Sequence, residues 1–556
     1  MTINFIILLF VILSMLAYLF NFVINHSQTI IQNYFNFKMK LKINKKQQNF
    51  FGYEKYKNKI TIYGINYFYY NNYLFKIKNF KNKFKISKNI IKIIILYFSK
   101  DSKYFDYVLN KKKKYNRLVS NNSINYFKLD VQNEKDLNLK IKKNDQILNI
   151  FFIGKKEKKK LVLILLLDGL SKNLTKHLPN TKKFFPKNNC FSNVYTNSPW
   201  TLPTFSNLLT GQYTSRHLNF SPDSYYGSFN YHKKNASLIN PHCNLFEFFK
   251  SKNFTTGCYS SYPRINPTYN FDKGVDIFKF CEKENTNEIT DNIISQLEMF
   301  NEGSNFIFAH LNDVHHKAKN FNQISDYAKF PVDNFDYKKH IDETYKDIKD
   351  DKYKKFIQIK NFHQRKEVVS DVKYCDLRLG SLYHYLRNKK FDDYTIILMG
   401  DHGTRLDKSQ SENVLNKNHQ NIGFFIKDKK NKFKNKKNNL IETIDIFPSL
   451  TSRFSKNNPH KKLIKQFDGK NTLFSSYKKK ITLSESIYNN KYDLFLNSEN
   501  MCLNSSYKIN NNFISKNYYK MFTNKKGKKI NASTNNKIIQ KFNFIEKQHI
   551  KKIDLT

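Results

Sequence analysis

A run of seven apolar residues, Leu161–Leu167, leads directly into the pair Asp168-Gly169. A continuous apolar run that ends in a turn is typical of a strand buried on both faces, as in a parallel sheet. Two further segments have the same form: residues 304–316 (SNFIFAHLNDVHH) and 394–403 (YTIILMGDHG). A helical pattern at 368–386 lies between them. Buried strands that alternate with helices predict an α/β fold with a mostly parallel central sheet.

The predicted strand ends carry side chains that can bind a metal ion. Ligands of such sheets bind outside the carboxyl ends of the strands, so we expect these side chains to lie together. Carboxylates and neutral imidazoles suit Zn or Mn, and carboxylates alone suit Ca or Mg. For one Asp-Gly pair the alternative is a simple turn. The residues concerned are Asp168, Asp313, His315, His316, Asp401 and His402.

A hydroxyl group lies at the start of a predicted helix in NSPWTLPTFSNLLTGQYTSRH, residues 197–217. Thr201 precedes the helical pattern, and Ser198 lies three residues earlier. The dipole and the free N–H groups of a helix N-terminus favour a nucleophile there. The alternative is that Thr201 only caps the helix.

The N-terminal segment 3–24 is uninterrupted and apolar, without charge. About 20 such residues span a bilayer, so we expect a single-pass anchor within residues 1–27. The first lysines follow this span, which would keep the bulk of the chain cytoplasmic, but lysine is frequent throughout the sequence.

Three further regions follow the anchor. Residues 28–158 alternate apolar and polar positions, which predicts a small β-rich accessory domain. We expect the catalytic domain at 159–490 and a peripheral C-terminal segment at 491–556, where the sequence is Asn/Lys-rich. The six cysteines lie far apart, so disulfides are allowed but no pairing follows from the sequence.

The net charge of +51 allows two interpretations. One is an anionic partner such as nucleic acid. The other is compositional drift, since Lys, Asn, Ile, Phe and Tyr dominate the chain and have AT-rich codons. No nucleic-acid-binding motif is present, so we expect no nucleic-acid partner.

Five segments occur in an order that resembles the sulfatase-like branch of the alkaline phosphatase superfamily. They are DGL (168–170), PNTKKFF (179–185), TLPTFSNLLTG (201–211), GDHGTR (400–405) and TIDIFPSL (443–450). The resemblance covers roughly residues 160 to 490. It implies an alkaline-phosphatase-like α/β sandwich and a divalent metal ion of unknown identity (Zn, Mn, Ca or Mg).

The family motif also implies roles for single residues. Thr201 takes the place of the nucleophile, and Ser198 falls outside the motif. The resemblance implies a metal-ligand set of Asp168, Thr201, Asp401 and His402. It further implies that substrate is contacted by His316, which would also take part in catalysis, and by Lys417 or His419.

Three departures from the family pattern bear on the reaction. Sulfatases use a Cys or Ser that is converted to formylglycine, and Thr201 cannot become this aldehyde. Phe205 stands where the motif has Arg, and Gly169 replaces the second Asp of the sulfatase opening, so one metal site is expected. Threonine is the nucleophile in the phosphodiesterase and phosphoethanolamine- or phosphoglycerol-transferase branches, which are often membrane-anchored with an outward-facing catalytic domain.

The resemblance therefore implies a membrane-anchored, metal-dependent hydrolase or transferase that acts on phosphate or sulfate esters through a covalent Thr201 intermediate. Its expected partners are an anionic ester substrate and the membrane, with the catalytic domain extracytoplasmic. The alternative is a catalytically inactive, membrane-tethered binding protein.

Overall fold

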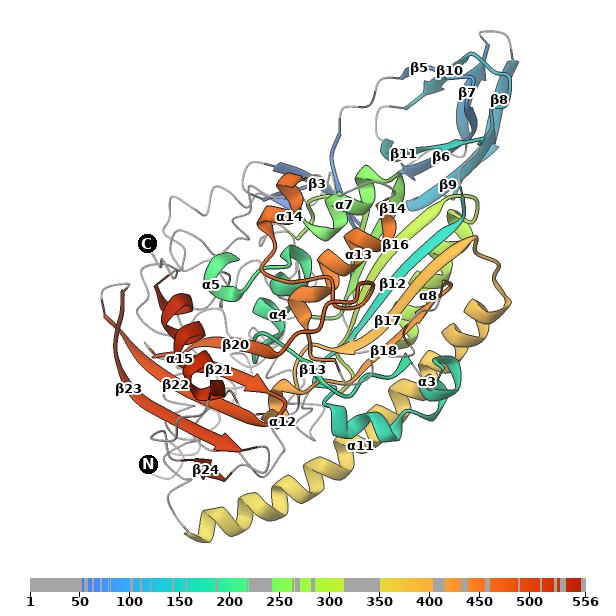
Figure 1. Ribbon diagram of the computed structural model, residues 1–556. Coiled ribbons are helices and arrows are strands. Elements are labelled where there is room, and N and C mark those ends of the chain that lie inside the picture. Colours follow the sequence, from blue (N-terminus) through green and yellow to red (C-terminus); the bar gives the residue numbers. More distant parts are fainter. Residues whose placement is uncertain are drawn as a thin grey trace, which may run out of the picture.

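Figure 1 shows the computed structural model of the chain. It describes residues 53–551, with gaps at 220–242, 315–350 and 404–414 and with gaps of six residues or fewer elsewhere. The expected anchor at 3–24 lies outside the described residues. Within the described part, no helix has both the length and the apolar character needed to cross a membrane.

The centre of the molecule is a ten-stranded sheet in which five successive strands are parallel. In sheet order these are β15 (Ile277–Phe280), β14 (Phe254–Ser260), β16 (Ser304–Leu311), β12 (Lys160–Leu167) and β17 (Asp393–Gly400). Antiparallel β18 (Phe424–Asp428) closes one edge. The predicted α/β fold is confirmed, but the central sheet is mixed: four of its strand pairings are parallel and five are antiparallel.

Helices cover both faces of this sheet (Figure 1). On β12, Val162, Ile164 and Leu166 pack in the core under α4 (Thr201–Thr210), α7 (Leu245–Ser251) and α13 (Ile446–Phe454). The alternate residues of Leu161–Leu167 pack in the other core, under α3 (Pro179–Phe184), α8 (Thr286–Met299) and α11 (Asp351–Asn388). Successive side chains of a strand point to opposite faces, so the continuous apolar run fills both cores. Each fully buried Leu or Ile contributes roughly 1.5–3 kcal/mol.

The strands of residues 28–158 fall into two groups, one in the central sheet and one in separate small sheets. The first four extend the central sheet beyond β15: β1 (Tyr53–Glu54), β2 (Lys59–Ile62), β3 (Ile65–Tyr70) and β4 (Tyr73–Lys76). The others form two small sheets: β5 (Lys83–Lys85), β6 (Ile90–Ser99), β7 (Tyr104–Leu109), β8 (Lys113–Leu118), β9 (Ser123–Asp130), β10 (Asp136–Lys140) and β11 (Gln146–Gly154). On β6, Ile93 and Ile95 enter the core of these small sheets, whereas Ile94 and Leu96 pack on the main domain.

A five-stranded antiparallel sheet near the C-terminus lies under helix α15 (Lys537–Ile550). Its strands are β20 (Ile481–Tyr488), β21 (Lys491–Ser498), β22 (Met501–Asn510), β23 (Phe513–Asn524) and β24 (Lys529–Ile530). The boundary expected at residue 490 lies inside the β20–β21 hairpin. The remaining elements are η3 (Lys172–His177), β13 (Val194–Tyr195), α5 (Thr214–His217), α12 (Lys417–Gln420), β19 (Ile441–Glu442), η8 (Thr443–Asp445) and α14 (Lys461–Gln466). All six cysteines are free thiols.

Candidate active site

Two of the predicted strand ends present their carboxylates to the same face of the sheet. Asp168 directly follows β12 and lies two residues after Leu166, which packs in the core under α4. Its side chain therefore points to the same face of the sheet as that of Leu166. Asp401 directly follows β17 and lies two residues after Met399, which packs in the same core, so its side chain points to that face as well. The two strands are parallel neighbours, so both side chains reach the carboxyl edge together. Both are fully buried.

Backbone groups fix the orientation of Asp401. Its Oδ1 accepts hydrogen bonds from the N–H of Gly169 at 2.9 Å and from the N–H of His402 at 2.7 Å. Gly169 has φ +71°, in the left-handed region that favours glycine. A Cβ on Gly400 would lie 2.2 Å from the carbonyl oxygen of Leu170. The turn after β12 therefore supplies an N–H at the position where sulfatases have a second Asp.

His402 directs one ring nitrogen toward both carboxylates. Its Nδ1 lies 2.9 Å from the carbonyl oxygen of Gly403, which assigns the ring proton to Nδ1. Nε2 then offers a lone pair, 3.6 Å from Oδ1 of Asp168 and 3.3 Å from Oδ2 of Asp401. The ring stacks on His419, with centroids 5.3 Å apart and planes 17° apart.

Thr201 is the first residue of α4, and its hydroxyl faces the strand ends. Trp200 occupies the N-cap position, and no side chain makes a capping hydrogen bond there. The Oγ1 atom of Thr201 lies 3.3 Å from Oδ2 of Asp168 and 3.3 Å from Nε2 of His402. The hydroxyl therefore does not cap the helix. It lies at the positive end of the helix dipole, beside both side chains.

These four side chains fit a divalent metal ion. In the described residues, Asp168, Asp401 and His402 are the one group of three or more His, Cys, Asp or Glu side chains whose ligand atoms all lie within 4.8 Å of one another. Oδ2 of Asp401 is buried and has no hydrogen-bond partner among the described residues. Burial, and then the charge of Asp168, raises the pKa of Asp401. A cation would offset both effects, and Thr201 Oγ1 would be a fourth oxygen or nitrogen ligand.

The structure does not bring every expected residue to this site. Asp313 follows β16, but its carboxylate accepts bonds from the N–H and hydroxyl of Thr286 at the start of α8. The prediction that Asp313 belongs to the metal cluster was therefore wrong. Its carboxylate caps α8, which lies on the other face of the sheet from α4. His315 and His316 lie outside the described residues. Lys417 begins α12, and its side chain is not described, whereas His419 is buried beside His402.

His310, a fully buried residue near the end of β16, was not predicted from the sequence as a site residue. Phe306 and Phe308 of this strand pack in the core under α4, so His310 faces the same side. Its Nε2 lies 3.5 Å from Oδ2 of Asp168. The alternation of side chains along the strand was the signal that could have selected His310 over Asp313.

Phe205 occupies the motif position of the sulfatase Arg and is part of the apolar core. Its ring is fully buried, with centroid distances of 4.6 Å to Phe271 and 4.6 Å to Phe308. No charged anchor for a modified nucleophile stands at this position.

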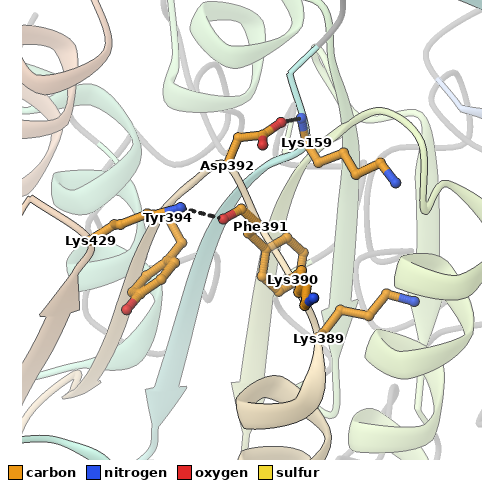
Figure 2. A pocket seen from close by; sticks show the side chains of 7 residues that line it. All are labelled: Lys159, Lys389, Lys390, Phe391, Asp392, Tyr394 and Lys429. Atoms are coloured by element: carbon orange, nitrogen blue, oxygen red, sulfur yellow. Dashed lines mark hydrogen bonds between the residues drawn. The ribbon is translucent and has the colours of Figure 1, made fainter.

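A hollow of about 570 Å³ lies near the amino ends of β12 and β17, at the opposite ends of these strands from Asp168 and Asp401 (Figure 2). Lysines line it, but the Lys389 ammonium pairs with Glu298 and the Lys429 ammonium donates to the carbonyl of Phe391. None of the candidate site residues lines it. Its place in the sheet separates it from the strand-end cluster.

A hydroxyl at a helix N-terminus faces carboxylates and an imidazole at the strand ends of an α/β sheet, an arrangement suited to an activated nucleophile. The family model described as Sulfatase matches residues 161–455, just over half of the chain. The chain belongs to the sulfatase family, which confirms its resemblance to the sulfatase-like branch of the alkaline phosphatase superfamily. It is a hydrolase or transferase acting on esters.

Solved structures share this fold at low sequence identity. The 2-O GAG sulfatase BT1596 has 13% identity and a TM-score of 0.50, covering 71% of this chain and 92% of its own. BT4656, solved with its substrate D-glucosamine-2-N,6-O-disulfate, has 13% identity and a TM-score of 0.50, covering 71% of this chain and 98% of its own. A search of curated protein sequences finds no match.

Proposed function

We propose that the chain is a membrane-anchored, metal-dependent enzyme that attacks phosphate esters through Thr201. The observation that carries the proposal is the position of Thr201 Oγ1, 3.3 Å from both Asp168 Oδ2 and His402 Nε2. Asp168, Asp401, His402 and Thr201 would hold the metal ion. When bound, a divalent ion supplies a Lewis acid that favours the alkoxide form of Thr201 and offsets charge on the transferred group.

Thr201 Oγ1 forms a bond to the phosphorus atom of the substrate while the bond from phosphorus to the leaving oxygen breaks. Asp168 Oδ2 is the carboxylate oxygen within reach of the hydroxyl proton. We assign to His419, whose ring stacks on His402, the role of offsetting charge that develops on the transferred group. We assign the same role to His316 and Lys417 on the family motif alone. Water (hydrolysis) or an acceptor hydroxyl (transfer) then displaces Thr201.

Phosphate esters are favoured over sulfate esters for two reasons. Threonine cannot form the formylglycine of sulfatases, and Phe205 fills the position of the Arg that anchors that group. The sulfated substrate of BT4656 is a property of that relative, and sulfate esters remain the second substrate class to be tested.

An inactive binding protein is the competing function, and the compact set of Thr201, Asp168, Asp401 and His402 speaks against it. The test is metal analysis of the purified full-length protein together with turnover of a phosphodiester, a phosphomonoester and a sulfate ester. We expect about one bound divalent ion per chain and turnover of a phosphate ester. Bound metal without turnover of any of the three esters would favour the binding protein.

A further inference from the structure

His310 is a polar residue between the apolar Ala309 and Leu311 of the same strand. It is the penultimate residue of β16, pairs in register with Leu166 of β12 and Ser260 of β14, and is fully buried. The backbone there is paired with a strand on each side, and the His310 carbonyl oxygen also accepts bonds from the N–H and the hydroxyl of Ser261. The imidazole therefore has a fixed starting point at the carboxyl edge of the sheet.

The ring of His310 has one charged neighbour within ion-pair distance in the described structure. Nε2 lies 3.5 Å from Asp168 Oδ2, and neither ring nitrogen makes a hydrogen bond to any described residue. The ring of Tyr262 lies 5.6 Å away, measured between centroids, and tilted by 41°. A buried imidazole without a hydrogen bond is unfavourable, and a small rotation of the Asp168 carboxylate would supply one.

The two oxygens of Asp168 have different surroundings. Oδ1 faces His402 Nε2 at 3.6 Å, within the proposed metal-ligand set. Oδ2 faces Thr201 Oγ1 at 3.3 Å and His310 Nε2 at 3.5 Å. His310 itself is outside the group whose ligand atoms all lie within 4.8 Å of one another, so it is not a ligand candidate.

We propose that His310 is a positioning residue for Asp168, and this inference rests on the metal site of the proposed function. Its Nε2–H donates to Oδ2 of Asp168 and holds the carboxylate so that Oδ1 is turned toward His402 and Asp401. Partners that orient a metal-bound carboxylate contribute about 10–100-fold to metal affinity.

The test compares three substitutions in the full-length protein. A Gln amide reaches the place of the imidazole Nε2, an Asn amide reaches only as far as Nδ1, and Leu donates no hydrogen bond. The dissociation constant for Zn²⁺, and separately for Mn²⁺, is measured by competition with a chromophoric chelator. We expect about 10–100-fold weaker binding for His310→Leu and His310→Asn, and binding within a few-fold of wild type for His310→Gln.

Thermal unfolding of the metal-free proteins separates positioning from a loss of packing. If His310→Leu does not fold, the Asn and Gln variants carry the test, since both are amides and differ only in reach. Wild-type affinity in His310→Asn or His310→Leu, or equal losses in His310→Asn and His310→Gln, would overturn the inference alone. A wild-type protein that binds neither ion would overturn the proposed metal site as well.

Discussion

The backbone N–H of Gly169 donates a 2.9 Å hydrogen bond to Oδ1 of Asp401, 232 residues later in the chain. This bond joins the turn after β12 to the turn after β17 and fixes one oxygen of Asp401. The other oxygen, Oδ2, is left 3.3 Å from His402 Nε2. One backbone contact between neighbouring strands therefore orients a carboxylate within the proposed metal site.

We predict that Asp401→Asn releases the divalent ion, because the substitution removes the charge and places an amide where Oδ2 stands. The matched control is Asp313→Asn, a buried Asp after strand β16 of the same sheet, whose carboxylate caps α8 instead. This control is expected to retain the metal and most of its stability, because Asn caps a helix about as well as Asp. Metal content measured by mass spectrometry tests both, and a metal-free Asp313→Asn would place Asp313 in the site after all.

We predict that Phe205→Arg destabilises the protein by several kcal/mol, because a guanidinium would replace a ring packed between Phe271 and Phe308. Phe205→Leu keeps an apolar side chain and is expected to cost roughly 1–3 kcal/mol. Urea unfolding of both variants measures the difference. A Phe205→Arg protein as stable as wild type would show that this position can accept the sulfatase Arg.

We predict an acid-sensitive contribution to stability from Glu485, which lies on β20. Burial opposes its charged form, but the charge of His549 and hydrogen bonds from His549, Tyr492 and the N–H of Ser215 outweigh burial and lower the pKa of Glu485. An unfolded Glu has a pKa of about 4.3. The contribution is therefore fully present above that pH and is lost as the pH falls through the lowered pKa of the folded state.

The measurement for Glu485 is the free energy of unfolding from pH 7 to pH 3. Glu485→Gln should be less stable than wild type at pH 7, and the two proteins should converge at low pH. Glu499→Gln, at an exposed position in the turn between β21 and β22, should follow the wild-type curve. A constant difference between Glu485→Gln and wild type across the range would contradict the assignment.

The sequence predicted the central strands well because they are buried on both faces. The apolar run Leu161–Leu167 matches β12 to within one residue. The sequence could not show which side chains at the strand ends belong to the site, since membership depends on the face of the sheet that each side chain occupies. Asp313 continues the face of Leu311, which packs under α8 and α11, whereas His310 lies on the face of α4. The extension of the sheet by β1–β4 was also missed, because alternation reveals a strand but not its partner.

We predict that the full-length chain remains with membranes after carbonate extraction, and that deletion of residues 1–27 releases an enzyme that retains its metal and turnover. The reason is that the apolar segment 3–24 is uncharged, while every candidate site residue lies beyond residue 160. Recovery of the full-length chain in the carbonate supernatant would exclude an integral anchor.

We predict that Thr201→Ala abolishes turnover with little change in melting temperature, because the hydroxyl makes no capping bond. Thr201→Ser keeps the hydroxyl and should retain partial activity. Ser198→Ala is the control for loss of a buried hydroxyl: Ser198 bonds to Thr214 and to the carbonyl of Glu485, so this change should cost about 1–3 kcal/mol of stability. Its turnover should stay near wild type.

The central claim is that Thr201 carries the transferred group. The direct measurement is peptide mass spectrometry of the enzyme after acid quench during turnover of a phosphodiester. We expect a phosphate-ester adduct on Thr201 in the wild-type enzyme and in Ser198→Ala, and no adduct in Thr201→Ala. Turnover by Thr201→Ala near the wild-type rate, or an adduct on another residue of the active wild-type enzyme, would contradict it.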